Sequence, residues 1–233
     1  MKSHAALLVI LLLVTPGVYA SNPASLGYSD ETVILGSDPD ACAGGVLTYN
    51  HDGSFESGYA WQYGGTVPPY YGCLAESYDL GPGSVACGAF WLSRLDWDPP
   101  RPSDCYVWES GICAAPSAVL GVVTDVDFHN VPHWPSLGQN DVDMNIPVTD
   151  SFTIGYWGDW PGAGCDYFCG ADLNGPGGHP WTCIAPGIGY ATGWQDPSII
   201  WGPTRSMGCG VYFEQTTPVG TQTWGTIKAL FGS

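Results

Sequence analysis

Basic residues are scarce in this sequence. Five Lys and Arg stand against 22 Asp and Glu in 233 residues, which gives a formal net charge of −17. Nucleic-acid-binding proteins replace counterions along the phosphate backbone with stripes of Lys and Arg. Anionic membrane surfaces attract clusters of the same residues. The sequence offers no such stripe or cluster, so we expect no nucleic-acid partner and no docking on an anionic membrane.

Long hydrophobic runs and several catalytic motifs are absent as well. No stretch reaches the roughly 20 apolar residues that span a bilayer, so the sequence predicts no membrane span. It contains no P-loop, no dinucleotide-binding glycine fingerprint, no G-x-S-x-G turn and no H-E-x-x-H helix. These absences argue against the common nucleotide-binding, serine-hydrolase and zinc-protease classes, and we favour a protein that is not an enzyme.

Turn-forming and aromatic residues are plentiful. The chain has 33 Gly and 20 Pro, both about twice their average usage. Hydrophobic residues make up 45% and aromatic residues 13% of the chain, enough for a core. Helical bundles need Ala, Glu, Lys and Leu at a spacing of 3.5–3.6 residues, and the sequence lacks that pattern. It instead alternates short apolar runs with turns, as in Asp141–Ile146, which is typical of strands.

These runs predict an all-β fold, an antiparallel β-sandwich or jelly roll stapled by disulfides. A short strand is expected at Thr32–Leu35, and a short helix or tail at the C-terminus, where Trp224–Phe231 has the length of two helical turns. The main expected strands are Val46–Tyr49, Tyr59–Tyr63, Cys73–Tyr78, Val85–Ser93, Cys105–Trp108, Ala118–Thr124, Val142–Val148, Phe152–Trp157, Ser198–Trp201 and Gly208–Glu214.

The first twenty residues have the three parts of a secretory signal peptide. Lys2 supplies the positive charge, Ala5–Val14 is an apolar run of ten, and Val18-Tyr19-Ala20 reads as a small-residue cleavage site. We therefore expect a secreted or cell-surface protein. The expected organisation is a signal peptide at 1–20, a lead-in segment at 21–41, a sandwich domain at 42–215, and a linker and tail at 216–233.

Nine cysteines in an exported chain favour disulfides. Cys105 and Cys113 flank a short turn, which suits a hairpin staple, and Cys183 has Cys165 or Cys169 as its candidate partner across a Gly-rich loop. Their connectivity does not follow from sequence. An odd count leaves at least one thiol free or intermolecular.

Two groups of residues could hold a metal ion. Asp52 and Glu56 place oxygen atoms on a Gly turn, and they are our first candidates for a structural calcium site. The alternative is that Asp and Gly only form the turn. The set Cys165, Cys169, His179 and Cys183 offers zinc ligands, but it lacks the tight Cys pairs typical of zinc sites.

Aromatic residues cluster beside Gly, Asp and Gln. Such clusters suit the apolar faces and polar edges of sugars, although the same residues also build sandwich cores. The candidate ligand-binding residues are Trp61, Tyr63, Trp157, Trp160 and Trp194. A glycan hydrolase needs two carboxylates about 5–10 Å apart; the acids that lie near aromatic residues are Asp96, Asp98, Glu109, Asp159 and Asp166.

Several segments resemble a group of uncharacterised secreted bacterial β-sandwich proteins. They are Tyr49–Gly65, whose opening reads Tyr49-Asn50-His51-Asp52-Gly53-Ser54-Phe55-Glu56, then Ile154–Gly158, Trp201–Thr204 and the tail Trp224-Gly225-Thr226-Ile227-Lys228-Ala229-Leu230-Phe231. The resemblance implies an exported bacterial β-rich domain and no particular activity.

Taken together, these patterns predict a secreted, non-catalytic β-sandwich module that binds extracellular polysaccharide or another surface glycan. The first alternative is a structural subunit of an extracellular fibre or surface coat, whose partners are copies of itself. The second is a glycan hydrolase.

Overall fold

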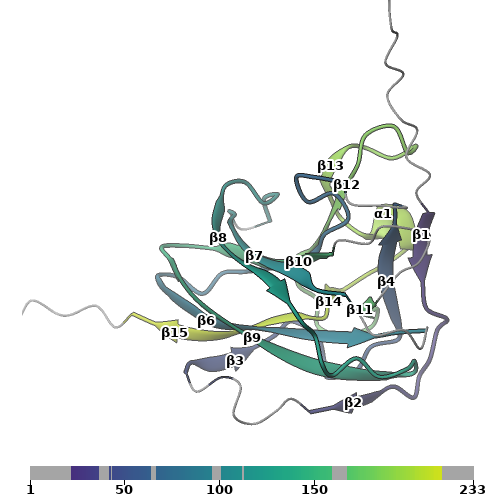
Figure 1. The fold of residues 1–233 in the computed structure, drawn as a ribbon, viewed down its shortest axis with the longest axis horizontal. Coiled ribbons are helices and arrows are strands. Elements are labelled where there is room, and N and C mark those ends of the chain that lie inside the picture. The colour runs from purple at the N-terminus through teal and green to yellow at the C-terminus, as the bar shows by residue number, and fades with distance from the viewer. Residues whose placement is uncertain are drawn as a thin grey trace, which may run out of the picture.

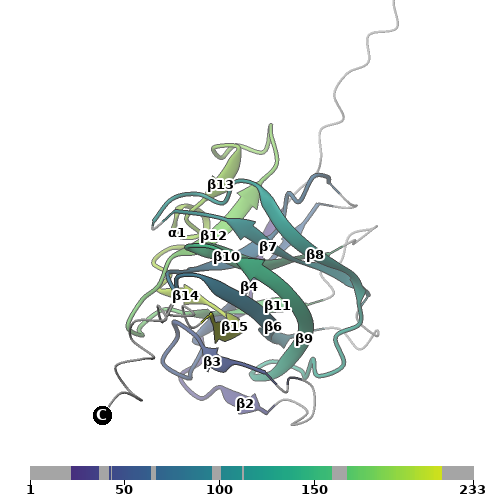
Figure 2. The same ribbon diagram turned by 90° about the vertical axis from the view of Figure 1, so that its left-hand side faces the viewer.

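The structure is a computed structural model, and it describes residues 22–36, 42, 44–63, 67–95, 101–111, 113–158 and 167–216. Two β-sheets, of six and nine strands, form its two layers; in Figures 1 and 2 the strands labelled β7, β8 and β10 belong to the upper layer, and those labelled β6, β9 and β15 to the lower one. The expected all-β sandwich is therefore confirmed. The described part of the chain contains no helix long and apolar enough to cross a membrane.

The nine-stranded sheet is built around β6, which pairs with β9 on one side and with β11 and β15 on the other. Its main path runs β1-β4-β11-β6-β15-β3, with β14 beside β11 and β2 beside β9. Its strands are β1 (Asn22–Ser25), β2 (Val33–Leu35), β3 (Val46–Thr48), β4 (Ser57–Gln62), β6 (Gly83–Ser93), β9 (Ser136–Val148), β11 (Phe168–Asp172), β14 (Ser206–Met207) and β15 (Cys209–Gln215).

The six-stranded sheet is wholly antiparallel and runs in the order β13-β12-β5-β10-β7-β8. Its strands are β5 (Leu74–Tyr78), β7 (Ser103–Glu109), β8 (Val119–Val126), β10 (Phe152–Gly158), β12 (Pro180–Ile184) and β13 (Gly193–Gln195).

The main core lies between the two sheets. Alternate residues of each strand point into it, as the pleat of a strand requires. Phe90 and Leu92 of β6 meet Ile154 and Tyr156 of β10 there, and all four are buried. Burying apolar side chains stabilises the fold by about 25 cal/mol for each Å² removed from water.

The predicted strands are largely correct, with one error. Ser198–Trp201 forms a short helix, α1, instead of a strand. Asp196 accepts a hydrogen bond from Ser198 N at 2.7 Å, and Pro197 O accepts one from Trp201 N at 3.1 Å. An Asp–Pro pair at the start of a segment is a helix-initiation signal that outweighs the β-branched residues after it.

The expected lead-in segment is part of the sandwich. β2 confirms the short strand predicted at Thr32–Leu35, and it pairs with β9 in parallel. β1, which the sequence did not reveal, pairs with β4 along its whole length. The expected signal peptide at 1–20 and the tail at 221–233 lie outside the described residues.

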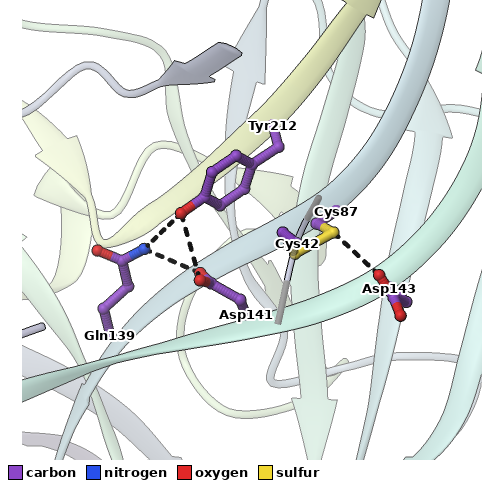
Figure 3. The surroundings of a disulfide bond; sticks show 6 residues. All are labelled: Cys42, Cys87, Gln139, Asp141, Asp143 and Tyr212. Atoms are coloured by element: carbon purple, nitrogen blue, oxygen red, sulfur yellow. Dashed lines mark hydrogen bonds between the residues drawn. A yellow bond between two sulfur atoms is a disulfide. The ribbon is translucent and has the colours of Figure 1, made fainter. Parts of the chain in front are cut away.

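One disulfide joins Cys42 to Cys87 of β6. Figure 3 shows its surroundings on β6 and β9, where Asp143 Oδ1 lies 3.2 Å from the Cys87 sulfur. Nearby, Gln139 Nε2 donates hydrogen bonds to Asp141 Oδ1 at 2.9 Å and to the Tyr212 hydroxyl at 3.2 Å. These contacts tie β9 and β15 together across the outer face of β6.

Part of the outer face of the nine-stranded sheet is covered by the chain itself. Trp91 and Ala89 of β6 point outward there, and Phe55 and Leu137 pack against them. His51 lies edge-on to Trp91, with their ring centroids 4.4 Å apart. Burial lowers the pKa of His51 to about 4, so this imidazole is neutral at pH 7 and acts as a packing group.

Candidate functional site: an aromatic sheet face

The outer face of the six-stranded sheet carries a continuous group of aromatic side chains. We call it the aromatic face; its members are Tyr70, Tyr71, Tyr106, Trp108, Trp157, Trp181 and Trp194. Trp108 is fully buried at the base of the group, while the other six are only partly buried. The aromatic face therefore presents apolar ring surface to solvent.

Strand register explains why these side chains gather. Trp181 of β12 pairs with Ala75 of β5, Ala75 with Gly155 of β10, and Gly155 with Tyr106 of β7. Two small residues thus form a low floor between the rings of Trp181 and Tyr106. Tyr70, from the loop before β5, lies over this region: its ring centroid is 5.4 Å from that of Tyr106.

The rings support one another. Tyr106 and Trp108 stack with centroids 5.1 Å apart, and Trp194 of β13 meets Trp108 edge-on at 5.0 Å. Aromatic pairs in such offset and edge-on arrangements contribute about 0.5–1.5 kcal/mol beyond their burial. The aromatic face is therefore held in a fixed shape before any ligand arrives.

Hydrogen bonds orient two of the indoles. Trp181 Nε1 donates to Ser77 Oγ at 2.9 Å, and Trp157 Nε1 donates to the Tyr71 carbonyl at 3.0 Å. Trp108 Nε1, by contrast, is buried and makes no hydrogen bond with the described residues. Such an unpaired buried donor costs about 1–3 kcal/mol.

A small cavity adjoins one end of the aromatic face. It has a volume of about 120 Å³ and is lined by Pro102, Asp104, Asp125 and Trp157. Trp157 pairs directly with Asp104 across β10 and β7, so a ring and a carboxylate lie side by side. Asp104 Oδ1 accepts a hydrogen bond from Asp125 N at 3.1 Å. This combination supplies polar acceptors next to an apolar surface.

Of the five predicted ligand-binding residues, two lie on the aromatic face and two lie in the interior. Trp157 and Trp194 belong to the aromatic face. Trp61 is 0% exposed, and its Nε1 donates to Thr182 Oγ1 at 2.7 Å in the interior. Tyr63 is 7% exposed, and its hydroxyl accepts a hydrogen bond from Ala185 N. The prediction that Trp61 and Tyr63 contact a ligand is therefore wrong, because both pack in the core. Trp160 lies outside the described residues.

Sequence reasoning missed Tyr106, Trp108 and Trp181. The alternation in Asp104–Trp108 was a usable signal for the first two, because every second residue shares a face. Trp181 lies in a strand that neighbouring Pro and Gly residues conceal in the sequence.

The predicted calcium residues lie beside the loop that follows β11. Ser54 Oγ is 2.7 Å from Asp52 Oδ1 and 3.0 Å from Glu56 Oε1. Glu56 Oε2 accepts a hydrogen bond from Leu173 N at 2.8 Å, and Asp172 Oδ2 accepts one from Asp52 N at 3.1 Å. The carboxylates of Glu56 and Asp172 thereby connect the loop before β4 to the loop after β11. Calcium binding by Asp52 and Glu56 stays a prediction.

One group of three metal-ligating side chains lies close together among the described residues: Cys42, Cys87 and Asp143. Its two sulfurs are bonded to each other, so it is not available to a metal. The ligands of the alternative zinc site do not gather among the described residues, because Cys169, His179 and Cys183 form no such group. The fourth candidate, Cys165, lies outside the described residues.

Glu76 has the raised pKa that a general acid needs, but its carboxyl is inaccessible. Burial raises the pKa of Glu76 to about 8, although Asn50 Nδ2, His179 N and Met207 N all donate hydrogen bonds to it. Glu76 is 0% exposed. Of the acids considered for a hydrolase, Glu109 is described and lies at the end of β7, whereas the others lie outside the described residues.

The expected cysteine staples are not present. Cys105 is buried and free, whereas Cys113 is exposed and its sulfur lies 3.4 Å from His179 Nε2. Cys169 and Cys183 are also free. The register of β5 and β12 sets Cys183 opposite Cys73 instead, and the Cys183 amide donates to the Cys73 carbonyl at 3.2 Å. The sequence did not reveal this pairing because it depends on which strands become neighbours.

No protein-family model, curated protein or solved structure matches the chain. The resemblance to secreted bacterial sandwich proteins therefore stays a prediction, and a function has to be inferred from the aromatic face.

Proposed function

We propose that this protein is an exported, non-catalytic module that binds uncharged polysaccharide through its aromatic face. The observation that carries the proposal is a set of six partly exposed Trp and Tyr side chains on one sheet surface. On the outer face of the other sheet, by contrast, Trp91 is covered by the chain's own residues, and the exposed outward side chains of Asp143 and Asn145 on β9 are polar.

The chemistry of the face suits sugar rings. Pyranose rings have apolar C–H faces that stack on indole and phenol rings, and hydroxyl edges that need fixed hydrogen-bond partners. Trp194 and Trp181 supply ring surface on the neighbouring strands β13 and β12, and Tyr106 supplies it on β7, beyond β5 and β10. Asp104 and Asp125 supply acceptors at the edge, beside Trp157. Successive sugar units of an extended chain are therefore expected to contact successive rings.

The test is the affinity of the oxidised protein for neutral polysaccharides. Soluble glucans, mannans and xylans in native affinity gels, with cellulose and chitin in pull-downs, cover the class. We expect at least one of these polymers to bind. Trp181→Ala and Trp194→Ala are each expected to weaken that binding by about tenfold, which corresponds to about 1.4 kcal/mol for one interface aromatic.

Tyr28→Ala is the matched control. This tyrosine is 67% exposed and lies between β1 and β2, away from the six-stranded sheet. Binding should be unchanged in it, and the circular dichroism spectra of all variants should match that of the parent, which shows that they are folded. Equal affinity in the parent and in both Trp variants would reject the aromatic face as the binding surface.

Self-association is the competing function. An extracellular fibre or coat subunit would use the same apolar face, or an edge strand such as β8 or β13, to bind another copy. Size-exclusion chromatography separates the two proposals, because a monomer that binds glycan and an assembly that elutes large are different results. The glycan hydrolase alternative requires products to be released from the bound polymer.

A further inference from the structure

Two cysteines of the nine-stranded sheet face each other in the core. The sulfurs of Cys169 and Cys209 lie 3.7 Å apart, and both side chains are fully buried. The pairing of Ala171 with Met207, and the hydrogen bond of 2.7 Å from Gly208 N to Gly170 O, continue in register toward these two residues. Both cysteines pair with β6, Cys169 with Leu92 and Cys209 with Phe90, two positions apart on the same face of that strand. Such positions are about 6.6 Å apart, within the roughly 4.4–6.8 Å between Cα atoms that a disulfide spans.

The surroundings leave these sulfurs few other roles. Neither belongs to a group of three close metal ligands among the described residues. Cys209 Sγ has a weak contact of 3.8 Å with the Leu74 carbonyl, and Tyr156 and Met207 are members of the same buried cluster. The sulfurs are 3.7 Å apart, and a disulfide bond is about 2.0 Å long. Rotation about the side-chain bonds of the two cysteines can close a gap of this size.

We propose that Cys169 and Cys209 form a disulfide when the chain folds in the presence of a small-molecule disulfide such as oxidised glutathione. The first protein thiol loses its proton to solvent, and its thiolate attacks one glutathione sulfur, releasing the other as a thiolate. The second protein thiolate then attacks the protein sulfur of the mixed disulfide and releases the second glutathione. Two protein thiols are thereby oxidised and one glutathione disulfide is reduced to two thiols.

The exchange belongs to folding and not to the finished protein. Both sulfurs are inaccessible once the strands have paired, and burial raises the pKa of the Cys209 thiol well above its usual value. A high pKa leaves little of the reactive thiolate. The bond therefore forms while β11 and β15 are still open to solvent.

The bond would also fix the position of part of the aromatic face. Cys169 and Cys209 are 40 residues apart, and the segment between them contains β12 and β13, which carry Trp181 and Trp194. The disulfide would close this segment at its base. The inference does not depend on what the aromatic face binds.

The experiment is disulfide mapping of the full chain, refolded with oxidised and reduced glutathione. Free thiols are blocked with N-ethylmaleimide under denaturing conditions, and the protein is digested with pepsin at acidic pH, where disulfides do not exchange. We expect a peptide pair linking Cys169 to Cys209, two mass units lighter than the two reduced peptides. The Cys42–Cys87 pair in the same digest shows that the conditions were oxidising.

Recovery of Cys169 and Cys209 as maleimide adducts, in a sample where Cys42–Cys87 is oxidised, would overturn the proposal. So would a link from Cys169 to Cys183 or to Cys105.

A pair of variants supplies a second readout. Cys169→Ala removes one buried thiol and the proposed bond, while Cys105→Ala removes one buried thiol alone. In oxidising buffer Cys169→Ala is expected to melt roughly 5–15 °C below Cys105→Ala, the range that follows from typical disulfide contributions. Equal melting temperatures of the two variants would contradict the bond.

Discussion

At the scale of single residues, Glu76 is unusual because it is a carboxylic acid in the interior of the fold. Its carboxyl is fully buried, yet three donors surround it: Asn50 Nδ2 at 2.8 Å, His179 N at 2.6 Å and Met207 N at 2.8 Å. It thereby joins β5 to the loop before β12 and to β14. Burial outweighs these hydrogen bonds and raises its pKa to about 8.

The raised pKa of Glu76 predicts a pH-dependent stability. In the unfolded chain the group ionises near its ordinary value of 4.5, but in the folded protein it keeps its proton to about pH 8. Its contribution to stability is therefore complete below about pH 4.5 and is lost as the pH rises through 8, by up to about 1.4 kcal/mol per pH unit. Glu76→Gln cannot ionise, so its free energy of unfolding should depend less on pH between 5 and 8.

Urea unfolding of the parent and of Glu76→Gln at several pH values measures this difference. Titrating groups that do not interact with Glu76 affect both proteins alike and cancel in the comparison. Parallel stability curves for the two proteins would show that Glu76 is ionised in both the folded and the unfolded states.

Residue chemistry alone did not separate core aromatics from surface aromatics. Trp61 and Trp181 each lie in a short strand, after an apolar residue and before a polar one. Yet Trp61 is 0% exposed, and Trp181 lies partly exposed on the aromatic face. The difference depends on which face of a strand meets the second sheet. That choice is made by strand pairing, which no single residue encodes.

At the scale of elements, the floor of the aromatic face depends on close approach of β10 to β5. A Cβ added at Gly155 would lie 2.5 Å from the Ala75 Cβ and would also meet the Leu74 carbonyl. Real Cβ atoms do not approach so closely, so the strands would have to separate.

Gly155→Ala is therefore expected to lower the free energy of unfolding by about 1–3 kcal/mol, the usual cost of overpacking. Gly27→Ala is the control, because a Cβ there has nothing within 4 Å, and it should be neutral or slightly stabilising. Chemical denaturation of both variants is the measurement. A Gly155→Ala protein as stable as the Gly27→Ala protein would mean that β10 and β5 can separate at this point without cost.

Most long strands could be predicted from the sequence because their alternation or apolar runs are strong, as in β6 and β9. The short strands β11, β12 and β13 could not, since Gly, Pro and Cys interrupt them and their stability comes from neighbours distant in sequence. The predictions of disulfide pairs were wrong for a related reason, because cysteines come together only where their strands become neighbours.

At the scale of the whole molecule, the net charge of −17 should determine which glycans bind. A protein of this charge repels polyanions, and the free energy gained from a few contacts does not offset that repulsion. Salt screens the repulsion, with a Debye length of about 10 Å at 0.1 M. We expect no retardation by dextran sulfate or alginate at low salt. Binding to a neutral polysaccharide should change less than about twofold between 0.05 and 0.5 M NaCl.

Affinity gels run at both salt concentrations provide the measurement, with the neutral polymer as the internal reference. Preferential binding to the sulfated polymer would contradict both this prediction and the choice of an uncharged ligand.

The central position of β6 has a consequence for how the chain reaches its folded state. Residues 83–93 find their partners in β9, β11 and β15, the last of which ends at Gln215. Contacts of such long sequence range make folding slow. While the chain is being synthesised, the nine-stranded sheet cannot close until nearly all of it has emerged. A chain with this topology therefore stays unfolded until late in its synthesis. Export across a membrane before folding requires a chain in that unfolded state.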